Sequence, residues 1–171
     1  MKKLLFRFIF ICLLLLSTFS LHLFFVYALP FPWNTINIIF IILFLYFIWT
    51  ESGLVVWLSF LIHFLVELYP VQSFGVILLP AVLSFLSGFW LYRVFFTNKS
   101  LFTTVFLMMY LLVAYRFFYT LSLIFTNHSL AFSWSSLFVV YFWEFILTTS
   151  ITIILFLLVV RFSPRLKTGN V

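Results

Sequence analysis

Charged residues are scarce in this sequence. Asp, Glu, Lys and Arg make up only 7% of its 171 residues, and Asp does not occur at all. A soluble domain carries about 25% charged residues, which cover its surface. Hydrophobic residues make up 67% of the chain and include 28 Phe. This composition excludes a soluble globule and predicts an integral membrane protein whose surface mostly faces lipid.

Other absences exclude particular kinds of chemistry. The single cysteine, Cys12, cannot form a disulfide within the chain. The three glutamates are the only acidic residues and lie far apart, so a pair of catalytic carboxylates is not indicated. The chain has no G-x-S-x-G, no H-E-x-x-H, no glycine-rich phosphate loop and no Cys/His ligand set. We therefore expect no enzyme activity, no cofactor and no nucleic-acid partner; the basic ends should attract anionic lipid instead.

The apolar residues fall into six runs, each near the roughly 20 residues that cross a bilayer. We predict helices over residues 4–29, 36–50, 53–69, 74–96, 101–125 and 132–160. Short connections with Pro, Asn or Ser separate them, as is typical between antiparallel neighbours. The sequence therefore predicts an all-α integral membrane protein, a six-transmembrane-helix bundle that forms a single domain over residues 1–171.

The distribution of basic residues decides between six helices and a fused 36–69 span. Lys and Arg stay on the cytoplasmic side in short loops. With six helices, eight basic residues share one side and the opposite loops carry none; the eight are Lys2, Lys3, Arg7, Arg93, Lys99, Arg161, Arg165 and Lys167. Both termini are therefore predicted to be cytoplasmic. Cleavage of residues 1–28 as a signal peptide is the alternative, but a signal core has only about 7–15 apolar residues, and this run is longer.

Two charged residues fall inside predicted helices, where lipid makes an unpaired charge costly. Arg116 and Glu144 lie at matching depth on adjacent antiparallel helices, so we expect them to form an ion pair. The pair could simply lock the two helices together, or it could belong to a substrate or proton-relay site.

Further polar residues recur at helical spacing on the same helices. Positions four apart share one helix face. Three such stripes are Glu144, Thr148 and Thr152; Arg116 and Thr120; and Ser59, His63 and Glu67. We predict that they converge on a polar seam held by interhelical hydrogen bonds, with metal binding by His63 and Glu67 as a weaker alternative.

The predicted helix over residues 74–96 contains three residues that affect helix packing and shape. Ser84 and Gly88 form a small-xxx-small pair that permits close approach of another helix. Pro80 should kink the helix. The segment before it, "ELYPVQSFG" (67–75), reads as a turn in which Pro70 ends one helix and Glu67 stays within reach of water.

The same segment resembles a stretch of the bacterial rod shape-determining MreD family, which runs Asp-Leu, a short spacer, then Pro-Phe-Gly or Pro-Leu-Gly. Here Glu67-Leu68 stands for Asp-Leu, Ser73 replaces the proline, and Phe74-Gly75 matches. The Gly53-Leu54 helix start and "RVFFTNKSL" (93–101), the basic turn after the following helix, are also similar. The change to Glu67 keeps the charge, whereas Ser73 leaves the turn less defined than proline would.

The resemblance implies a non-enzymatic scaffold of the cell-elongation machinery in the bacterial cytoplasmic (inner) membrane, organising lateral peptidoglycan synthesis. It implies MreC-like, MreB-like and RodA-like partners and a penicillin-binding transpeptidase, besides membrane lipids. We expect the partner surface to include Phe74, Gly75, Ser84 and Gly88.

The family fold is also similar to the substrate-binding subunits of energy-coupling-factor transporters. A small-molecule-binding transport subunit, with the polar seam as its site, is therefore the alternative function. A large cavity lined by Arg116, Glu144 and Glu67 would favour transport, and a filled apolar interior would favour scaffolding.

Overall fold

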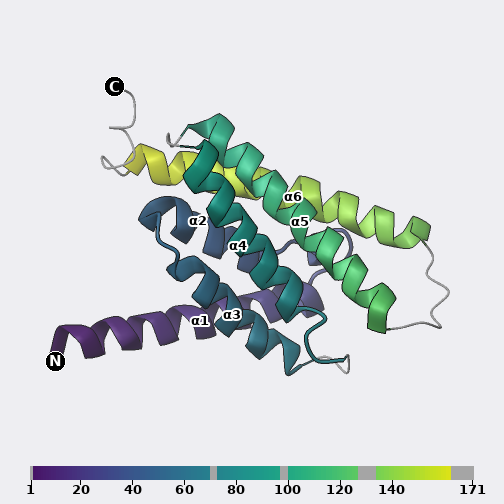
Figure 1. Ribbon diagram of the computed structural model, residues 1–171, viewed down its shortest axis with the longest axis horizontal. Coiled ribbons are helices and arrows are strands. Elements are labelled where there is room, and N and C mark those ends of the chain that lie inside the picture. The colour runs from purple at the N-terminus through teal and green to yellow at the C-terminus, as the bar shows by residue number, and fades with distance from the viewer. Residues whose placement is uncertain (1, 70–72, 97–99, 127–133, 163–171) are drawn as a thin grey trace.

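The computed structural model is a bundle of α-helices (Figure 1) and describes residues 2–69, 73–96, 100–126 and 134–162. Within these ranges there are six α-helices and one 3₁₀-helix: α1 (Lys2–Ala28), η1 (Trp33–Thr35), α2 (Ile38–Thr50), α3 (Leu54–Glu67), α4 (Leu78–Phe95), α5 (Leu101–Thr126) and α6 (Trp134–Phe162). The predicted all-α architecture of six helices is confirmed. Helix α4, however, begins at Leu78 and not at position 74.

The helices differ in whether they can cross a membrane alone. Helices α1, α4, α5 and α6 are long and apolar enough to do so. Helices α2 and α3 have 13 and 14 residues, which at ~1.5 Å per residue is about 20 Å, against a hydrocarbon core of about 30 Å. Length and composition thus give the described part of the chain four candidate spans, as in a multi-pass membrane protein.

Successive helices run in opposite directions (Figure 1). One end of the bundle holds the start of α1 and the ends of α2, α4 and α6; we call it the basic end, because Arg93 lies there on α4. The opposite end, where α1, α3 and α5 finish, is called the far end. A hydrogen bond from Tyr92 Oη to Glu51 Oε1, of 3.2 Å, joins α4 to the α2–α3 turn at the basic end.

The α2–α3 turn keeps these two helices separate. Glu51 adopts a left-handed conformation with φ of 50° and closes α2 through its N–H, which donates to Phe47 O at 2.8 Å. A left-handed residue interrupts the helical path. Two antiparallel helices therefore occupy residues 38–67 where a single bent span was the alternative.

Helix α2 forms the centre of the bundle. It is apolar all round, as expected of a helix that neighbours enclose, and it contacts α1, α3, α5 and α6. Its Phe40 ring lies 4.9 Å from the rings of both Phe85 on α4 and Tyr115 on α5. Further along, the Phe47 ring lies 5.1 Å from that of Tyr92. Because protein surrounds α2, its shortness exposes little backbone to lipid.

Glu67 and Gly75 shape the connection from α3 to α4. The Glu67 carboxylate accepts hydrogen bonds from the N–H groups of Ile77 and Leu78 at 3.0 and 2.6 Å. These amides start α4, where a negative charge is favourable. Gly75 has φ of +96°, which a side chain would strain. Glu67 is only 5% exposed, so the expectation that it reaches water was wrong.

Two expectations for α4 also need correction. Pro80 is the third residue of α4, in the first turn, where the N–H that proline lacks would make no intrahelical hydrogen bond. Pro80 is therefore not expected to kink α4. Ser84 and Gly88 are buried, and a Cβ built on Gly88 would lie 2.5 Å from Leu111 Cδ2 on α5. This small-residue pair therefore packs inside the bundle and is not a surface for an external partner.

Candidate functional site

The ion pair predicted from the sequence is present at the centre of the site. Arg116 Nε on α5 donates to Glu144 Oε2 on α6. Glu144 is 2% exposed, and the Arg116 side chain is 24% exposed. The second carboxylate oxygen, Oε1, accepts a hydrogen bond of 3.1 Å from Asn37 Nδ2. Two donors from different helices thus compensate the buried carboxylate, as burial of a charge requires.

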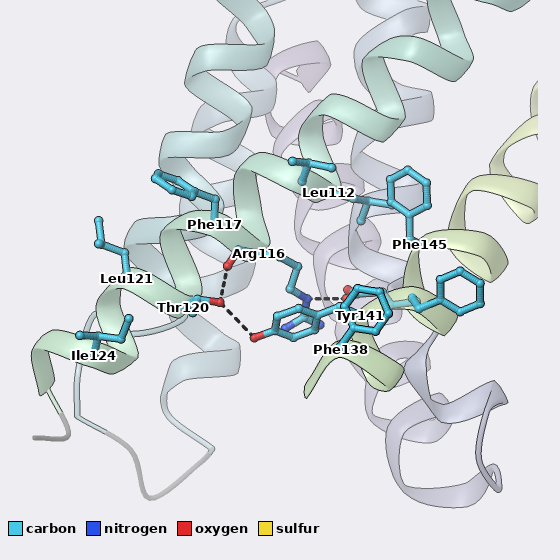
Figure 2. Close-up of a pocket in the computed structure, with 12 residues that line it drawn as sticks. Leu112, Arg116, Phe117, Thr120, Leu121, Ile124, Phe138, Tyr141 and Phe145 are labelled. Atoms are coloured by element: carbon cyan, nitrogen blue, oxygen red, sulfur yellow. Dashed lines mark hydrogen bonds and ion pairs between the residues drawn. The ribbon is translucent and has the colours of Figure 1, made fainter. Parts of the chain in front are cut away.

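Aromatic rings surround the guanidinium of Arg116. Its central carbon lies 4.5 Å from the ring centre of Tyr141, 5.1 Å from Tyr115 and 5.4 Å from Tyr119. Ring faces at such distances attract a cation. Thr120 Oγ1 donates to Arg116 O at 2.8 Å and lies 3.3 Å from Tyr141 Oη (Figure 2). The three rings and the ion pair with Glu144 hold the guanidinium between α5 and α6.

Asn37 joins the centre of the bundle to α6, and sequence analysis did not identify it. Its Oδ1 caps α2 by accepting from Phe40 N at 3.2 Å, while its own N–H donates to Thr148 Oγ1 at 3.1 Å. Thr152 Oγ1 in turn donates to Thr148 O at 2.7 Å. An Asn immediately before an apolar helical run is a sequence signal for a helix start, and that signal was available here.

The predicted polar seam is only partly continuous. His63 and Ser59 are buried next to each other, and His63 Nδ1 lies 2.9 Å from Ser59 O. A carbonyl oxygen only accepts, so Nδ1 carries a proton, which in the neutral imidazole leaves Nε2 as the acceptor. Glu67 is committed to the start of α4 and does not share the cavity of the ion pair. Within the described residues no group of three or more His, Cys, Asp or Glu could hold a metal ion.

A polar cavity of about 320 Å³ lies beside the ion pair. Its polar lining comes from α1, η1 and the helices that follow, and includes His22, Asn34, Asn37, His63, Arg116 and Glu144. Two of these side chains have a buried atom with no hydrogen-bond partner among the described residues, His22 Nδ1 and Asn34 Oδ1. Native proteins leave few buried polar atoms unpaired, so these two atoms distinguish the cavity from an ordinary packing gap.

An apolar groove of about 510 Å³ runs between α5 and α6 (Figure 2). Its walls are mainly aliphatic and aromatic: Leu112, Phe117, Leu121, Ile124, Phe138 and Phe145. Phe117 and Phe138 are exposed, so the groove opens on the surface of the bundle. Arg116 and Glu144 line the groove as well as the polar cavity. The ion pair therefore marks the place where an apolar and a polar space meet.

The described residues form an all-α bundle with four candidate membrane spans and a polar cavity beside a buried ion pair. Comparison with models of known protein families, with curated proteins and with solved structures finds no match to this chain. The resemblance of residues 67–75 to the MreD family therefore stays a prediction.

Proposed function

We propose that this chain is a non-enzymatic scaffold of the bacterial cell-elongation machinery, as its resemblance to the MreD family implies. The supporting observation is that the residues of the resemblance act together. Glu67 caps α4, and Gly75 has the positive φ that the turn requires. An acid and a glycine at this spacing are what such a capped turn needs, so the motif has a physical reason to recur in proteins of this shape.

The remaining motif residues suggest where a partner would bind. Leu68 and Phe74 are 65% and 67% exposed, whereas Glu67 and Gly75 are buried. The motif thus divides into residues that build the turn and residues that face outward. Because few described residues lie outside helices, recognition of an MreC-like partner would run through such helix-end surfaces within the membrane.

Co-purification with an MreC-like protein from the same bacterium tests this proposal. Phe74→Ala should weaken recovery of the partner while leaving thermal stability in detergent nearly unchanged, because Phe74 is exposed. Leu79→Ala, at a residue that is 58% exposed on α4, is the matched control and should retain the partner. Equal recovery with both variants would contradict a partner surface at Phe74; no recovery with the parent protein would contradict the proposed function.

A second candidate, a small-molecule-binding subunit of a membrane transporter, is supported by the polar cavity. Its volume of about 320 Å³ lies at the lower end of ligand pockets, which span about 300–1,000 Å³. Arg116 and Glu144 line it, as that alternative requires, but Glu67 does not. A tightly bound water-soluble compound, found by mass spectrometry of the purified protein, would favour this function over scaffolding.

A further inference from the structure

The polar cavity and the apolar groove together have the form of a site for an amphiphile. The two spaces share Arg116 and Glu144 as lining residues, so the ion pair borders both, and a molecule that extends across the pair would contact both. The groove offers aliphatic and aromatic walls on the lipid-facing side of α5 and α6. The cavity offers hydrogen-bonding groups from six parts of the chain: α1, η1, the start of α2, α3, α5 and α6.

The charge of the site indicates the chemistry of the polar portion. Arg116 and Glu144 compensate each other, so neither an anion nor a cation meets a free opposite charge there. An anionic group would lie against the Glu144 carboxylate and the unpaired Asn34 Oδ1, both of which are acceptors. A cationic group would lie against Arg116. An uncharged headgroup avoids both repulsions.

The hydrogen-bonding groups of the cavity indicate which uncharged headgroup would fit. Asn34 Oδ1 and His63 Nε2 accept, whereas the guanidinium of Arg116 and the amide of Asn37 donate. A hydroxyl group can donate and accept at the same time. Several hydroxyl groups on one small headgroup would therefore satisfy this mixed lining better than a group that only donates or only accepts.

We infer that the protein binds an amphiphile with an uncharged, hydroxyl-rich headgroup in the polar cavity and one apolar chain in the groove. The Arg116–Glu144 pair lies at the junction of head and chain. This binding does not depend on the proposed scaffolding function, since it rests on the cavity, the groove and their shared residues alone.

Ligand titration of the full chain in a detergent without sugar tests the inference. The probe is octyl glucoside below its micellar concentration; free glucose lacks the chain, and octyl phosphate replaces the neutral head with an anion. Octyl glucoside should bind at least tenfold more tightly than either control. Equally tight binding of glucose would mean a water-soluble ligand, and equally tight binding of octyl phosphate would mean unselective filling of the groove; either result overturns the inference.

Substitution of the two unpaired residues locates the headgroup. Asn34→Leu and His22→Phe each remove a buried atom that has no partner among the described residues, so the ligand-free protein should not lose thermal stability. Each should weaken octyl glucoside binding at least tenfold. Val140→Ala, at an apolar position of the same cavity, is the control and should bind as the parent does. Unchanged binding in both polar variants would place the headgroup elsewhere and overturn the proposed site.

Discussion

The two ends of the bundle are built differently around the same central helix. Toward the basic end, α2 presents Phe44 and Phe47, which are fully enclosed, and Phe47 packs on Tyr92. Toward the far end, Asn37 caps the start of α2, and its hydrogen bonds reach Thr148 and Glu144 beside the polar cavity. Close packing of aromatic rings stabilises the basic end. The far end instead contains the compensated charge of Glu144 and the polar cavity beside it. The candidate site lies where packing is incomplete.

The largest expected effect comes from breaking the Arg116–Glu144 ion pair, which lies toward the far end beside the polar cavity. Glu144→Gln leaves the Arg116 charge uncompensated, which for a buried pair typically costs about 3–5 kcal/mol. The free energy of unfolding in detergent should fall by this amount, whereas Glu51→Gln, at an exposed turn, should change it far less. Equal stability of the two variants would show that the pair does not support the bundle.

A double substitution tests whether the bundle requires the ion pair itself or only requires that no buried charge is left uncompensated. Replacing both Arg116 and Glu144 by Met removes the pair and leaves no uncompensated charge, so much of the lost stability should return. If the double variant is as unstable as Glu144→Gln, the hydrogen bond from Asn37 to Glu144 is the more important contact.

An intermediate effect is expected from overfilling the α4–α5 contact. Gly88→Leu introduces atoms where a Cβ alone would already lie 2.5 Å from Leu111 Cδ2. Overpacking of a close-packed interior typically costs about 1–3 kcal/mol, measurable as a lower unfolding temperature. Gly53→Ala is the control, because its Cβ would meet only the Phe89 ring, at 3.3 Å. Full stability of Gly88→Leu would contradict the close α4–α5 approach.

The smallest expected change in stability comes from substituting two adjacent threonines on α6, Thr148 and Thr149, of which only Thr148 bonds to Asn37. Thr148→Val removes the acceptor of the Asn37 N–H, a hydrogen bond worth about 1 kcal/mol. Thr149 Oγ1 is buried without a partner among the described residues, so Thr149→Val should be neutral or slightly stabilising. The same substitution at neighbouring positions should therefore change the unfolding temperature in different directions. Identical shifts would show that the hydrogen bond from Asn37 N–H to Thr148 does not stabilise the bundle.

The sequence was sufficient for the helices and for the pair, because apolar runs mark helices and the pair lies on two helices that follow each other in the chain. Apolar runs bounded by Pro, Asn and Ser predicted the helix bounds, and matching depth on adjacent helices predicted Arg116–Glu144. The start of α4 was placed too early because Phe74, Val76 and Ile77 are apolar. Only the Gly75 conformation and the Glu67 cap exclude these residues from the helix.

Contacts between distant segments could not be predicted in the same way. Ser84 and Gly88 indicate that something approaches closely, but the sequence does not say that the neighbour is Leu111 of the same chain. His22 and Asn34 each look like isolated polar residues, and only the fold brings them to one cavity with Arg116. The site therefore depends on tertiary arrangement more than the helices do.

Cysteine labelling tests most directly the prediction that α2 and α3 run between the two ends and that the far end faces away from the cytoplasm. In a Cys12→Ser background, Ser73→Cys lies in the connection from α3 to α4 and reports on the far end. Ser52→Cys lies in the α2–α3 turn and reports on the basic end. A membrane-impermeant maleimide should label position 73 in intact bacteria and position 52 only after permeabilisation. Labelling of both positions from the same side, or no labelling of position 52 under either condition, would contradict this arrangement.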